Sequence, residues 1–470
     1  MRTQKIKNVG IFTVFFMVFS FISAQEISGT WHGVLKVPSQ ELPIVFHITN
    51  LDGVYITTMD SPAQGAKGLA TDKTTFENNE LNIVMSKLMV VFNGTLNNDS
   101  IDGTFTQGGM PFPLKLTKGE FRFKAKPQEP SKPYPYLSEE VIFVNPDAEN
   151  IKLAGTLTIP KNIKNPPVVI LISGSGPQNR NEELLGHKPF LVLSDHLTKK
   201  GIAVLRYDDR GVANSEGNFS KATTYDFASD VEAAVAYLKT RGDVVDIQKI
   251  GLAGHSEGGM IAPVVASKNK SIAFCVLLAG PGISGKEILL TQTRKAYELA
   301  GIPESEIVLN EKYSDQIYDI IKNDKWDESD KQIKDLFYKI KEESTGILKA
   351  KYTDETINKS MEQLNSPWMT EFIKFDPKRY LSKTTCPLLA INGEKDTQVL
   401  PYLNLEGIKK SLKVAGNKDV TVMELKDLNH LFQTSKNGSF SEYAKIEETF
   451  SSIALNIISD WINKRFSKNI

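Results

Sequence analysis

Apolar residues recur at every second position in short runs between Ile27 and about Phe123. Examples are positions 44, 46 and 48 and the stretch from Val90 to Leu96. Period-two runs that are closely punctuated by turn residues are typical of antiparallel strands. We therefore predict that residues 25–123 form an all-β sandwich or small barrel. The expected turns lie at Asp52-Gly53, Asn78-Asn79, Asn97-Asn98 and Asp102-Gly103.

Prolines accumulate directly after this region, between residues 124 and 139. Proline fixes its own φ angle and donates no backbone hydrogen bond, so a proline-dense segment neither continues a sheet nor starts a helix. We predict an extended linker and a domain boundary here. The prolines are Pro127, Pro130, Pro133 and Pro135.

The hydrophobic pattern changes after residue 140. Continuous apolar runs now alternate with helical patterns, for example at 190–200 and 224–240. Such runs are typical of strands buried on both faces of a parallel sheet. Their alternation with helices predicts a doubly wound, mostly parallel α/β domain over residues 140–470. The expected strands are 151–159, 168–172, 202–205, 250–253, 272–278, 388–391 and 420–425.

One gap between these strands, from Gly282 to Lys383, is too long for a single crossover helix. It contains about four amphipathic helical stretches that are rich in Lys, Glu and Asp. Two interpretations are open. The insertion, approximately residues 283–383, is either a helical cap over an active site or a peripheral layer of helices.

The N-terminus carries an export signal pattern. Arg2, Lys5 and Lys7 precede the uncharged apolar run from Val9 to Ile22, and small residues follow at Ser23-Ala24. This order predicts a signal peptide over residues 1–24 and a periplasmic or secreted mature protein. The apolar run is shorter than the ~20 residues that a membrane-spanning helix needs, so we expect no stable membrane insertion after cleavage. An uncleaved anchor is the alternative.

Composition narrows the classes of partner. Hydrophobic residues make up 40% of the chain and charged residues 24%, as in ordinary globular proteins. Lys+Arg and Asp+Glu are equal at 56 each, which gives no overall field for binding nucleic acid. The only cysteines, Cys275 and Cys386, adjoin apolar strand-like runs and are expected to be buried; a disulfide between them stays open.

A glycine-flanked serine lies between a predicted strand and a helical run, in the segment Gly254-His255-Ser256-Glu257-Gly258. This is the G-x-S-x-G pattern in strand–turn–helix context, in which a tight turn strains the serine backbone and exposes its hydroxyl at the head of a helix. The helix N-terminus favours negative charge there. We predict that Ser256 is a catalytic nucleophile.

A serine nucleophile needs a base, and the expected chain order is Ser, then Asp or Glu, then His. His430 is the only histidine after Ser256, and it follows the last predicted strand. The acid should follow the preceding strand, where Asp396 is the candidate and Glu394 the alternative. The acid would hold the imidazole tautomer and stabilise the imidazolium.

The tetrahedral oxyanion of acyl transfer needs two backbone N–H donors. Glu257, which follows the nucleophile, is predicted to supply one. Ser175, in the glycine-rich loop 173–177 after the strand 168–172, is predicted to supply the other, with Gly176 as the alternative. The loop could instead cradle phosphate, but it lacks the Gly-Lys-Ser/Thr ending of a P-loop.

These motifs together resemble a group of bacterial α/β-hydrolases, the carboxylesterases related to the dienelactone-hydrolase and serine-aminopeptidase branches. The resemblance covers roughly residues 140–468 and implies ester hydrolysis without a metal or organic cofactor. It also implies that the insertion is a cap and that Ser366–Met369 lies near the acyl pocket. The motifs are Ser173–Arg180, Arg206–Gly211, Gly254–Pro263, Asn392–Asp396 and Leu428–His430.

Some residues depart from the resemblance or fall outside the predicted triad. Ala213 stands where these proteins usually have glycine, and Asn179 and Asn181 stand where acidic residues are expected. A structural role is predicted for the remaining residues with reactive side chains. Ion pairs that fix the loop beside the site are expected for Arg206, Asp208, Asp209 and Arg210, and His255 is expected to point into packing. His32 and His47 are expected to be structural and not ligands. His187 and His196 precede Ser256 and so break the chain order that the triad requires.

The sequence therefore predicts a serine hydrolase that transfers small or medium acyl groups from esters to water through an acyl-enzyme. Its expected partner is a small-molecule ester. Two alternatives remain: a peptidase or amidase with the same triad, and an exported binding protein whose hydrolase domain is vestigial.

Overall fold

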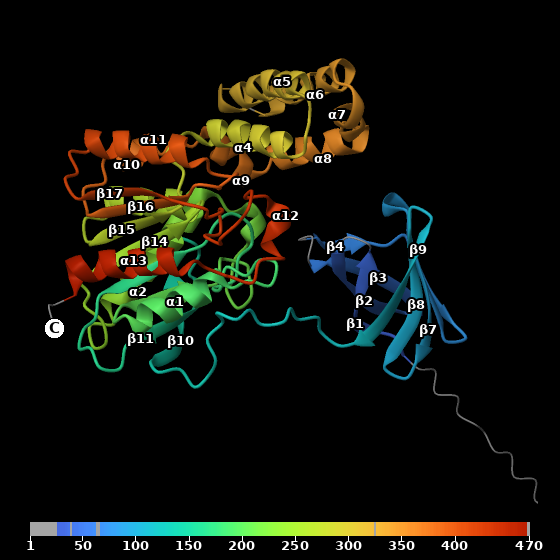
Figure 1. The fold of residues 1–470 in the computed structure, drawn as a ribbon, viewed down its shortest axis with the longest axis horizontal. Helices are drawn as coiled ribbons and strands as arrows, with labels where there is room; N and C mark the ends of the chain where they lie inside the picture. Colours follow the sequence, from blue (N-terminus) through green and yellow to red (C-terminus); the bar gives the residue numbers. More distant parts are fainter. Residues whose placement is uncertain (1–25, 38–39, 63–65, 324–325, 468–470) are drawn as a thin grey trace, which may run out of the picture. The chain divides into compact units, whose positions relative to one another are not determined.

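The computed structural model describes residues 26–37, 40–62, 66–323 and 326–467. The chain divides into two compact units, one up to Arg122 and one from Phe123 onward (Figure 1). The predicted signal peptide, residues 1–24, lies outside the described residues. Within the described ranges, no helix combines the length and the apolar character that crossing a membrane requires.

The first unit contains a single nine-stranded sheet in the order β4-β3-β2-β1-β9-β8-β7-β6-β5. All its described pairings are antiparallel, and β1 pairs with β9, which joins the early and late strands of the unit. Near the two ends of the sheet, Thr74 Oγ1 on β5 donates to Thr57 Oγ1 on β3 at 2.9 Å. The all-β prediction is confirmed, and one curled sheet agrees with a small barrel. The strands are β1 (Gly29–Val37), β2 (Gln40–Leu51), β3 (Val54–Ser61), β4 (Ala66–Ala70), β5 (Lys73–Glu77), β6 (Glu80–Met85), β7 (Val90–Asn97), β8 (Ser100–Gln107) and β9 (Met110–Lys118), with a 3₁₀ turn, η2 (Ser86–Leu88).

One predicted turn in this unit is wrong, because Asp102 and Gly103 lie inside β8. A Cβ atom on Gly103 would lie 2.5 Å from the carbonyl oxygen of Asn93 on the neighbouring strand and 2.6 Å from the ring of Phe92. This glycine therefore permits close packing between strands. The chain reverses later, at Gly108 and Gly109, both of which have positive φ angles.

The second unit is built on an eight-stranded sheet in the order β10-β11-β13-β12-β14-β15-β16-β17. From β13 to β17 neighbouring strands are parallel, whereas β10 and β11 pair antiparallel at one edge. The predicted strands are all present, and β10 is additional. The strands are β10 (Leu137–Asn145), β11 (Ile151–Ile159), β12 (Val168–Ile172), β13 (Ala203–Tyr207), β14 (Ile250–His255), β15 (Phe274–Leu278), β16 (Leu388–Gly393) and β17 (Val420–Leu425).

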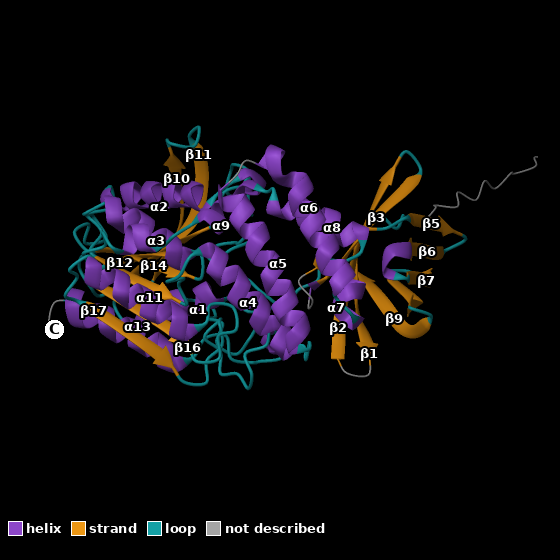
Figure 2. Cartoon of the chain, turned by 90° about the horizontal axis from the view of Figure 1, so that it is seen from above, coloured by secondary structure: helices purple, strands orange, loops and turns teal. Residues whose placement is uncertain are grey.

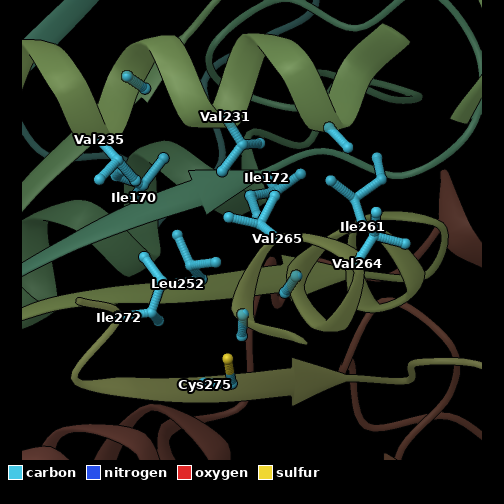
Figure 3. Packing of buried hydrophobic residues seen from close by; sticks show 14 of the residues in the cluster. Ile170, Ile172, Val231, Val235, Leu252, Ile261, Val264, Val265, Ile272 and Cys275 are labelled. Atoms are coloured by element: carbon cyan, nitrogen blue, oxygen red, sulfur yellow. The ribbon is translucent and has the colours of Figure 1, made fainter. Parts of the chain in front are cut away.

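Helices cover both faces of this sheet, as a parallel sheet requires. Val168, Ile170 and Ile172 of β12 enter one hydrophobic cluster, and the alternate residues Val169 and Leu171 enter another. The first cluster includes side chains from α2, α3 and α11, and Figure 3 shows part of it. The second includes side chains from α1 and α13. These helices are α1 (Pro189–Lys199), α2 (Thr224–Lys239), α3 (Gly258–Lys268), α11 (Pro401–Val414) and α13 (Ser452–Phe466), with the shorter η3 (Phe219–Lys221) and α12 (Phe440–Tyr443).

The insertion between β15 and β16 has more helices than the four expected. The described residues form seven, several of them short and begun by a capping serine or threonine, as at Thr353 and Ser366. Most of these helices share a hydrophobic cluster of their own, and Figures 1 and 2 show α4, α5, α6 and α8 grouped together. The helices are α4 (Gly285–Leu299), α5 (Glu304–Asn323), α6 (Trp326–Glu343), α7 (Gly346–Lys351), α8 (Asp354–Leu364), α9 (Pro367–Lys374) and α10 (Lys378–Leu381).

The proline-rich segment requires a correction, because it does not behave as a free spacer. It belongs to the second unit, and β10 begins within it at Leu137. Lys126 Nζ donates to the carbonyl oxygen of Ile446 at 2.8 Å, and Gln128 Nε2 to that of Phe450 at 2.7 Å. Extended backbone leaves side chains free to bond outward, so this segment docks along the second unit.

The packing of β14 against β15 predicts the effect of a single methyl group. A Cβ atom on Gly251 would lie 2.2 Å from the ring of Phe274, which is fully buried. We expect Gly251→Ala to lower the free energy of unfolding by ~1–3 kcal/mol, the usual cost of overpacking. Urea unfolding measures this. Gly242→Ala is the control, because its Cβ would meet nothing closer than 3.6 Å; equal effects of the two changes would contradict the prediction.

Candidate active site

The turn between β14 and α3 has the geometry predicted for a nucleophile. Ser256 has a positive φ angle of 51°, a strained conformation for a residue with a side chain. A Cβ atom on Gly254 would lie 2.0 Å from the carbonyl oxygen of Gly258, and one on Gly258 would lie 2.1 Å from that of Ile172. Both glycines are therefore needed for the turn to close, and the strand–turn–helix context of Ser256 is confirmed.

The structure brings Asp396 and His430 together. Asp396 follows β16 and His430 follows β17, and His430 Nδ1 lies 2.7 Å from Asp396 Oδ2. Both side chains are almost fully buried. The other carboxylate oxygen of Asp396 accepts the N–H groups of Gln398 and Val399 at 2.8 and 2.9 Å. A carboxylate on Nδ1 leaves Nε2 as the free nitrogen of the neutral ring.

Glu394, the alternative acid, lies elsewhere in the same turn. Its Oε2 accepts the backbone N–H of Asp427 at 3.0 Å, and Asp396 alone of the two contacts His430 among the described hydrogen bonds. The geometry therefore favours Asp396.

His255, the residue before Ser256, contacts His430. The imidazole rings of His255 and His430 have centroids 4.8 Å apart, and His255 directly precedes Ser256 in the chain. Within the described residues, the contacts of His430 do not include a direct hydrogen bond to the Ser256 hydroxyl. Hydrogen bonds between catalytic groups are often long before substrate binds.

The glycine-rich loop after β12 lies against the elbow. A Cβ atom on Gly174 would lie 3.2 Å from Ser256 Cβ. The N–H of Gly174 donates to Glu182 Oε1 at 2.7 Å and is therefore already engaged. The next backbone N–H along the loop belongs to Ser175. Glu257 is the N-cap residue of α3, where backbone N–H groups lack intrahelical acceptors. Ser175 and Glu257 thus remain the candidate oxyanion donors.

Buried carboxylates hold this loop in place. Arg180 donates to both oxygens of Asp208, from Nε at 3.0 Å and from Nη2 at 2.6 Å. Asp209 accepts the Ser173 hydroxyl at 2.6 Å and the Gln178 N–H at 3.0 Å. The loop next to Ser256 is therefore anchored at several points along its length.

The structural role predicted for the Arg206–Arg210 cluster is confirmed only in part. Asp208 and Arg210 form ion pairs, the latter with Asp230 at 2.7 Å. Asp209 instead accepts neutral donors, and Arg206 donates to the side-chain oxygen of Asn181. Predicting ion pairs for those two residues was wrong, because the groups that the loop after β12 presents to them are neutral: the Ser173 hydroxyl, the Gln178 N–H and the Asn181 amide.

Ala213 stands where the resemblance leads us to expect glycine, and it adopts a backbone conformation typical of glycine. Its φ angle is 49°, in the left-handed region that glycine adopts without strain. Alanine at this position therefore adopts the left-handed conformation for which glycine is the preferred residue.

The other histidines have structural partners. His187 is fully buried between the Thr449 hydroxyl and the carbonyl oxygen of Tyr443, and His196 lies 3.2 Å from the Ser459 hydroxyl. His47 in the first unit lies 2.9 Å from Asp60. In the described part of the chain, no group of three or more His, Cys, Asp or Glu side chains could hold a metal ion.

One further feature was not predicted from the sequence. Glu182 lies 2.9 Å from His255 Nδ1, so His255 belongs to a polar network and not only to the packing. This contact has no local sequence signal, because it joins segments far apart in the chain.

The disulfide that the sequence left open is not formed in the structure. Cys275 and Cys386 are free thiols whose sulfur atoms lie 3.8 Å apart. Cys275 is buried as expected, whereas Cys386 is only partly buried.

The sheet topology and the elbow can now be set beside known proteins. The family model described as serine aminopeptidase, S33, matches residues 189–336, from α1 through the elbow into the insertion. Over these residues the chain is similar to that family. The match covers the turn around Ser256 and the first helices of the insertion.

Two curated proteins resemble this chain. Esterase EstD of Thermotoga maritima is 26% identical over 296 residues, which are 62% of this chain and 61% of the esterase. Dipeptidyl peptidase 8 of Homo sapiens is 29% identical over 161 residues, 32% of this chain and 18% of the peptidase. The chain thus spans less than two thirds of the length of either relative. A solved esterase of Pyrococcus furiosus is 18% identical, with 74% of this chain and 99% of that one covered and a TM-score of 0.43.

The buried loop anchor Asp209 predicts a pH effect on stability. Burial raises the pKa of Asp209 to about 8, and nearby Glu182 and Glu257 add to the rise against the hydrogen bonds from Ser173 and Gln178. Because the folded-state pKa exceeds the ordinary value of 3.8, the folded protein keeps a proton that the unfolded chain loses between these values. The stabilising contribution is therefore complete below about pH 4 and is lost as the pH rises to about 8.

We expect Asp209→Asn, which mimics the protonated carboxyl, to remove this pH dependence. Its free energy of unfolding should fall less steeply with pH than that of the unmodified protein, by up to ~1.4 kcal/mol per pH unit. Urea unfolding between about pH 5 and 8 measures the two slopes. Asp243→Asn, at an exposed position, is the control. Parallel slopes for the protein and Asp209→Asn would contradict the prediction.

Proposed function

We propose that this protein is an α/β-hydrolase that cleaves carboxylic esters of small to medium acyl groups through a Ser-His-Asp triad. The observation that carries the proposal is the buried Asp396–His430 pair, 2.7 Å apart, at the end of the sheet where Ser256 occupies its strained turn. Carboxylate, imidazole and serine occur here in the chain order and sheet positions that serine hydrolysis on this fold uses. The likeness to esterase EstD supports the choice of an ester substrate.

In the proposed reaction, His430 Nε2 takes the Ser256 proton as the hydroxyl attacks the ester carbonyl. The N–H groups of Glu257 and Ser175 stabilise the resulting oxyanion, each contributing ~3–4 kcal/mol in comparable sites. His430 then gives the proton to the leaving alcohol, and water releases the acyl group from Ser256 by the same steps. Asp396 keeps Nε2 facing the serine and stabilises the imidazolium.

A contact from the insertion supports its assignment as a cap. Trp368 Nε1 on α9 donates to Glu257 Oε1 at 2.8 Å, and Thr224 Oγ1 donates to the same oxygen at 2.7 Å. Glu257 directly follows the nucleophile, so α9 reaches the elbow itself. An insertion anchored at this point would limit the size of the acyl group, which is why we propose small to medium acyl chains.

A peptidase or amidase with the same triad is the second candidate. The description of the matching family and the likeness to dipeptidyl peptidase 8 favour it. Amides and esters pass through the same tetrahedral oxyanion, so the triad alone does not separate them. Comparing the rates of hydrolysis of p-nitrophenyl acetate and of aminoacyl p-nitroanilides would separate the esterase from the peptidase or amidase. A binding protein with a vestigial hydrolase unit would turn over neither substrate.

Export of the protein is part of the proposal. It is supported by the charged, apolar and small-residue segments of positions 1–24 in their order. Fractionating cells that express the full chain, with mass spectrometry of the mature N-terminus, tests it: an N-terminus at Met1 on cytoplasmic protein would refute export.

Removing the nucleophile should abolish both turnover and covalent labelling. We expect Ser256→Ala to lower kcat/KM for p-nitrophenyl acetate by at least ~10³-fold and to abolish reaction with a fluorophosphonate probe. Ser271→Ala, at an exposed serine, is the control and should keep both. A Ser256→Ala protein that still hydrolyses the ester at the original rate would end the proposal.

The contact between cap and elbow predicts a milder effect. Trp368→Phe removes the Nε1–H donor but can keep the stack on Phe372, whose ring centroid lies 5.1 Å away. A net hydrogen bond contributes ~0.5–1.5 kcal/mol, so we expect kcat/KM for esters to fall about threefold to tenfold. Steady-state kinetics measures this. Trp326→Phe on α6 is the matched control, and an equal loss in both variants would show that the donor is irrelevant.

A further inference from the structure

His255 connects the elbow with two other loops of the site. Its Nδ1 lies 2.9 Å from Glu182 Oε1, and its Nε2 lies 2.9 Å from the backbone carbonyl oxygen of His430. Glu182 Oε1 also accepts the N–H of Gly174 at 2.7 Å. One pair of side chains thus joins the loop of the predicted oxyanion donor, the nucleophile elbow and the loop of the predicted general base.

The partners of His255 determine where its protons are. A carbonyl oxygen only accepts hydrogen bonds, so Nε2 must carry a hydrogen to bond the His430 backbone. Nδ1 faces a carboxylate oxygen that already accepts from Gly174, which favours a second N–H. A histidine that donates from both nitrogens is an imidazolium.

We propose that His255 and Glu182 form a buried imidazolium–carboxylate pair that positions His430 and the Ser175 loop for catalysis. The inference rests on the proposed function of Ser256 and His430, and it assigns a positioning role to two residues that take no part in bond making. A neutral His255 would keep only one N–H, so it would lose either its bond to Glu182 or its bond to the His430 carbonyl, and the remaining nitrogen lone pair would face an oxygen.

The surroundings of His255 favour its charged form. Glu182 faces it from the loop after β12, Asp396 lies on the side of the loop after β16, and His430 and Phe432 approach from the loop after β17. Asp209, after β13, interacts with Glu182. Burial alone would lower the pKa of His255, but the charge and hydrogen bond of Glu182 raise it above its ordinary value of 6.5.

The pair predicts a change in the shape of the pH profile. In Glu182→Gln the side chain can still accept hydrogen bonds but no longer stabilises the imidazolium by charge. His255 should then lose its proton at lower pH, so the alkaline limb of kcat/KM should move towards neutral pH while the acidic limb stays. We expect a loss of about 10–100-fold at alkaline pH, typical of misplaced catalytic groups, and a smaller loss near pH 6.

Two readouts separate positioning from general damage. The rate of fluorophosphonate labelling of Ser256 should follow the same pH shift, and Glu183→Gln, at the exposed neighbouring position, should leave both profiles unchanged. His255→Gln, whose amide can still donate to the His430 carbonyl at every pH, should keep more activity than His255→Phe. A uniform loss in Glu182→Gln at all pH values, with an unmoved alkaline limb, would overturn the proposal.

A measurement on the unaltered protein tests the proton assignment directly. In full-length protein with ¹⁵N-labelled histidine, both ring nitrogens of His255 should have the chemical shifts of protonated nitrogens near pH 7, with His255→Gln assigning the signals. One unprotonated ring nitrogen of His255 would refute the imidazolium, whatever the activity of the variants. The spectrum is independent of turnover, so inactivity towards esters would refute the proposed function and leave this result standing.

Discussion

The close approach of backbone at the turn between β14 and α3 is the constraint on which the rest of the site depends. Gly254, Gly258 and the carbonyl of Ile172 lie so close that a methyl group at either glycine would overlap backbone atoms. Gly259 repeats this against Gly280, where a Cβ would lie 2.6 Å from the neighbouring Cα. The turn is tight enough to force Ser256 to a φ angle of 51°. The position of the Ser256 hydroxyl therefore depends on the surrounding glycines, which have no Cβ atoms.

Four acidic side chains around this turn each bind a different segment. Asp396 binds His430, Glu182 binds His255 and Gly174, Asp209 binds Ser173, and Glu257 binds Trp368. All four are nearly fully buried, where a carboxyl group without hydrogen-bond partners would be costly. Each segment is therefore kept in place by the cost of leaving its carboxyl group without partners, which is larger than the net gain of an ordinary hydrogen bond.

Local sequence patterns predicted the parts of this arrangement that depend on neighbours in the chain. Continuous apolar runs identified β12, β14 and β16 because both faces of these strands are buried, and the glycines around Ser256 identified the turn because they are adjacent to it. The same reasoning missed β10, an edge strand with several exposed residues that follows a proline-rich stretch. It also predicted a turn at Gly103, where the glycine instead leaves room for the backbone and side chains of the neighbouring strand.

The parts of the site that the sequence did not reveal all depend on contacts between distant segments. Nothing near Glu182 indicates that a histidine 73 positions later will lie 2.9 Å away, and nothing in α9 indicates that Trp368 will donate to the residue after the nucleophile. The contact between Asp396 and His430 could be predicted because the order of the strands restricts where each of these residues can lie. His255 had no such rule, and a variable position in a motif was taken as packing. A buried histidine with an acceptor at each ring nitrogen is, however, more than packing, because its protonation state then determines whether the loops that it joins stay together.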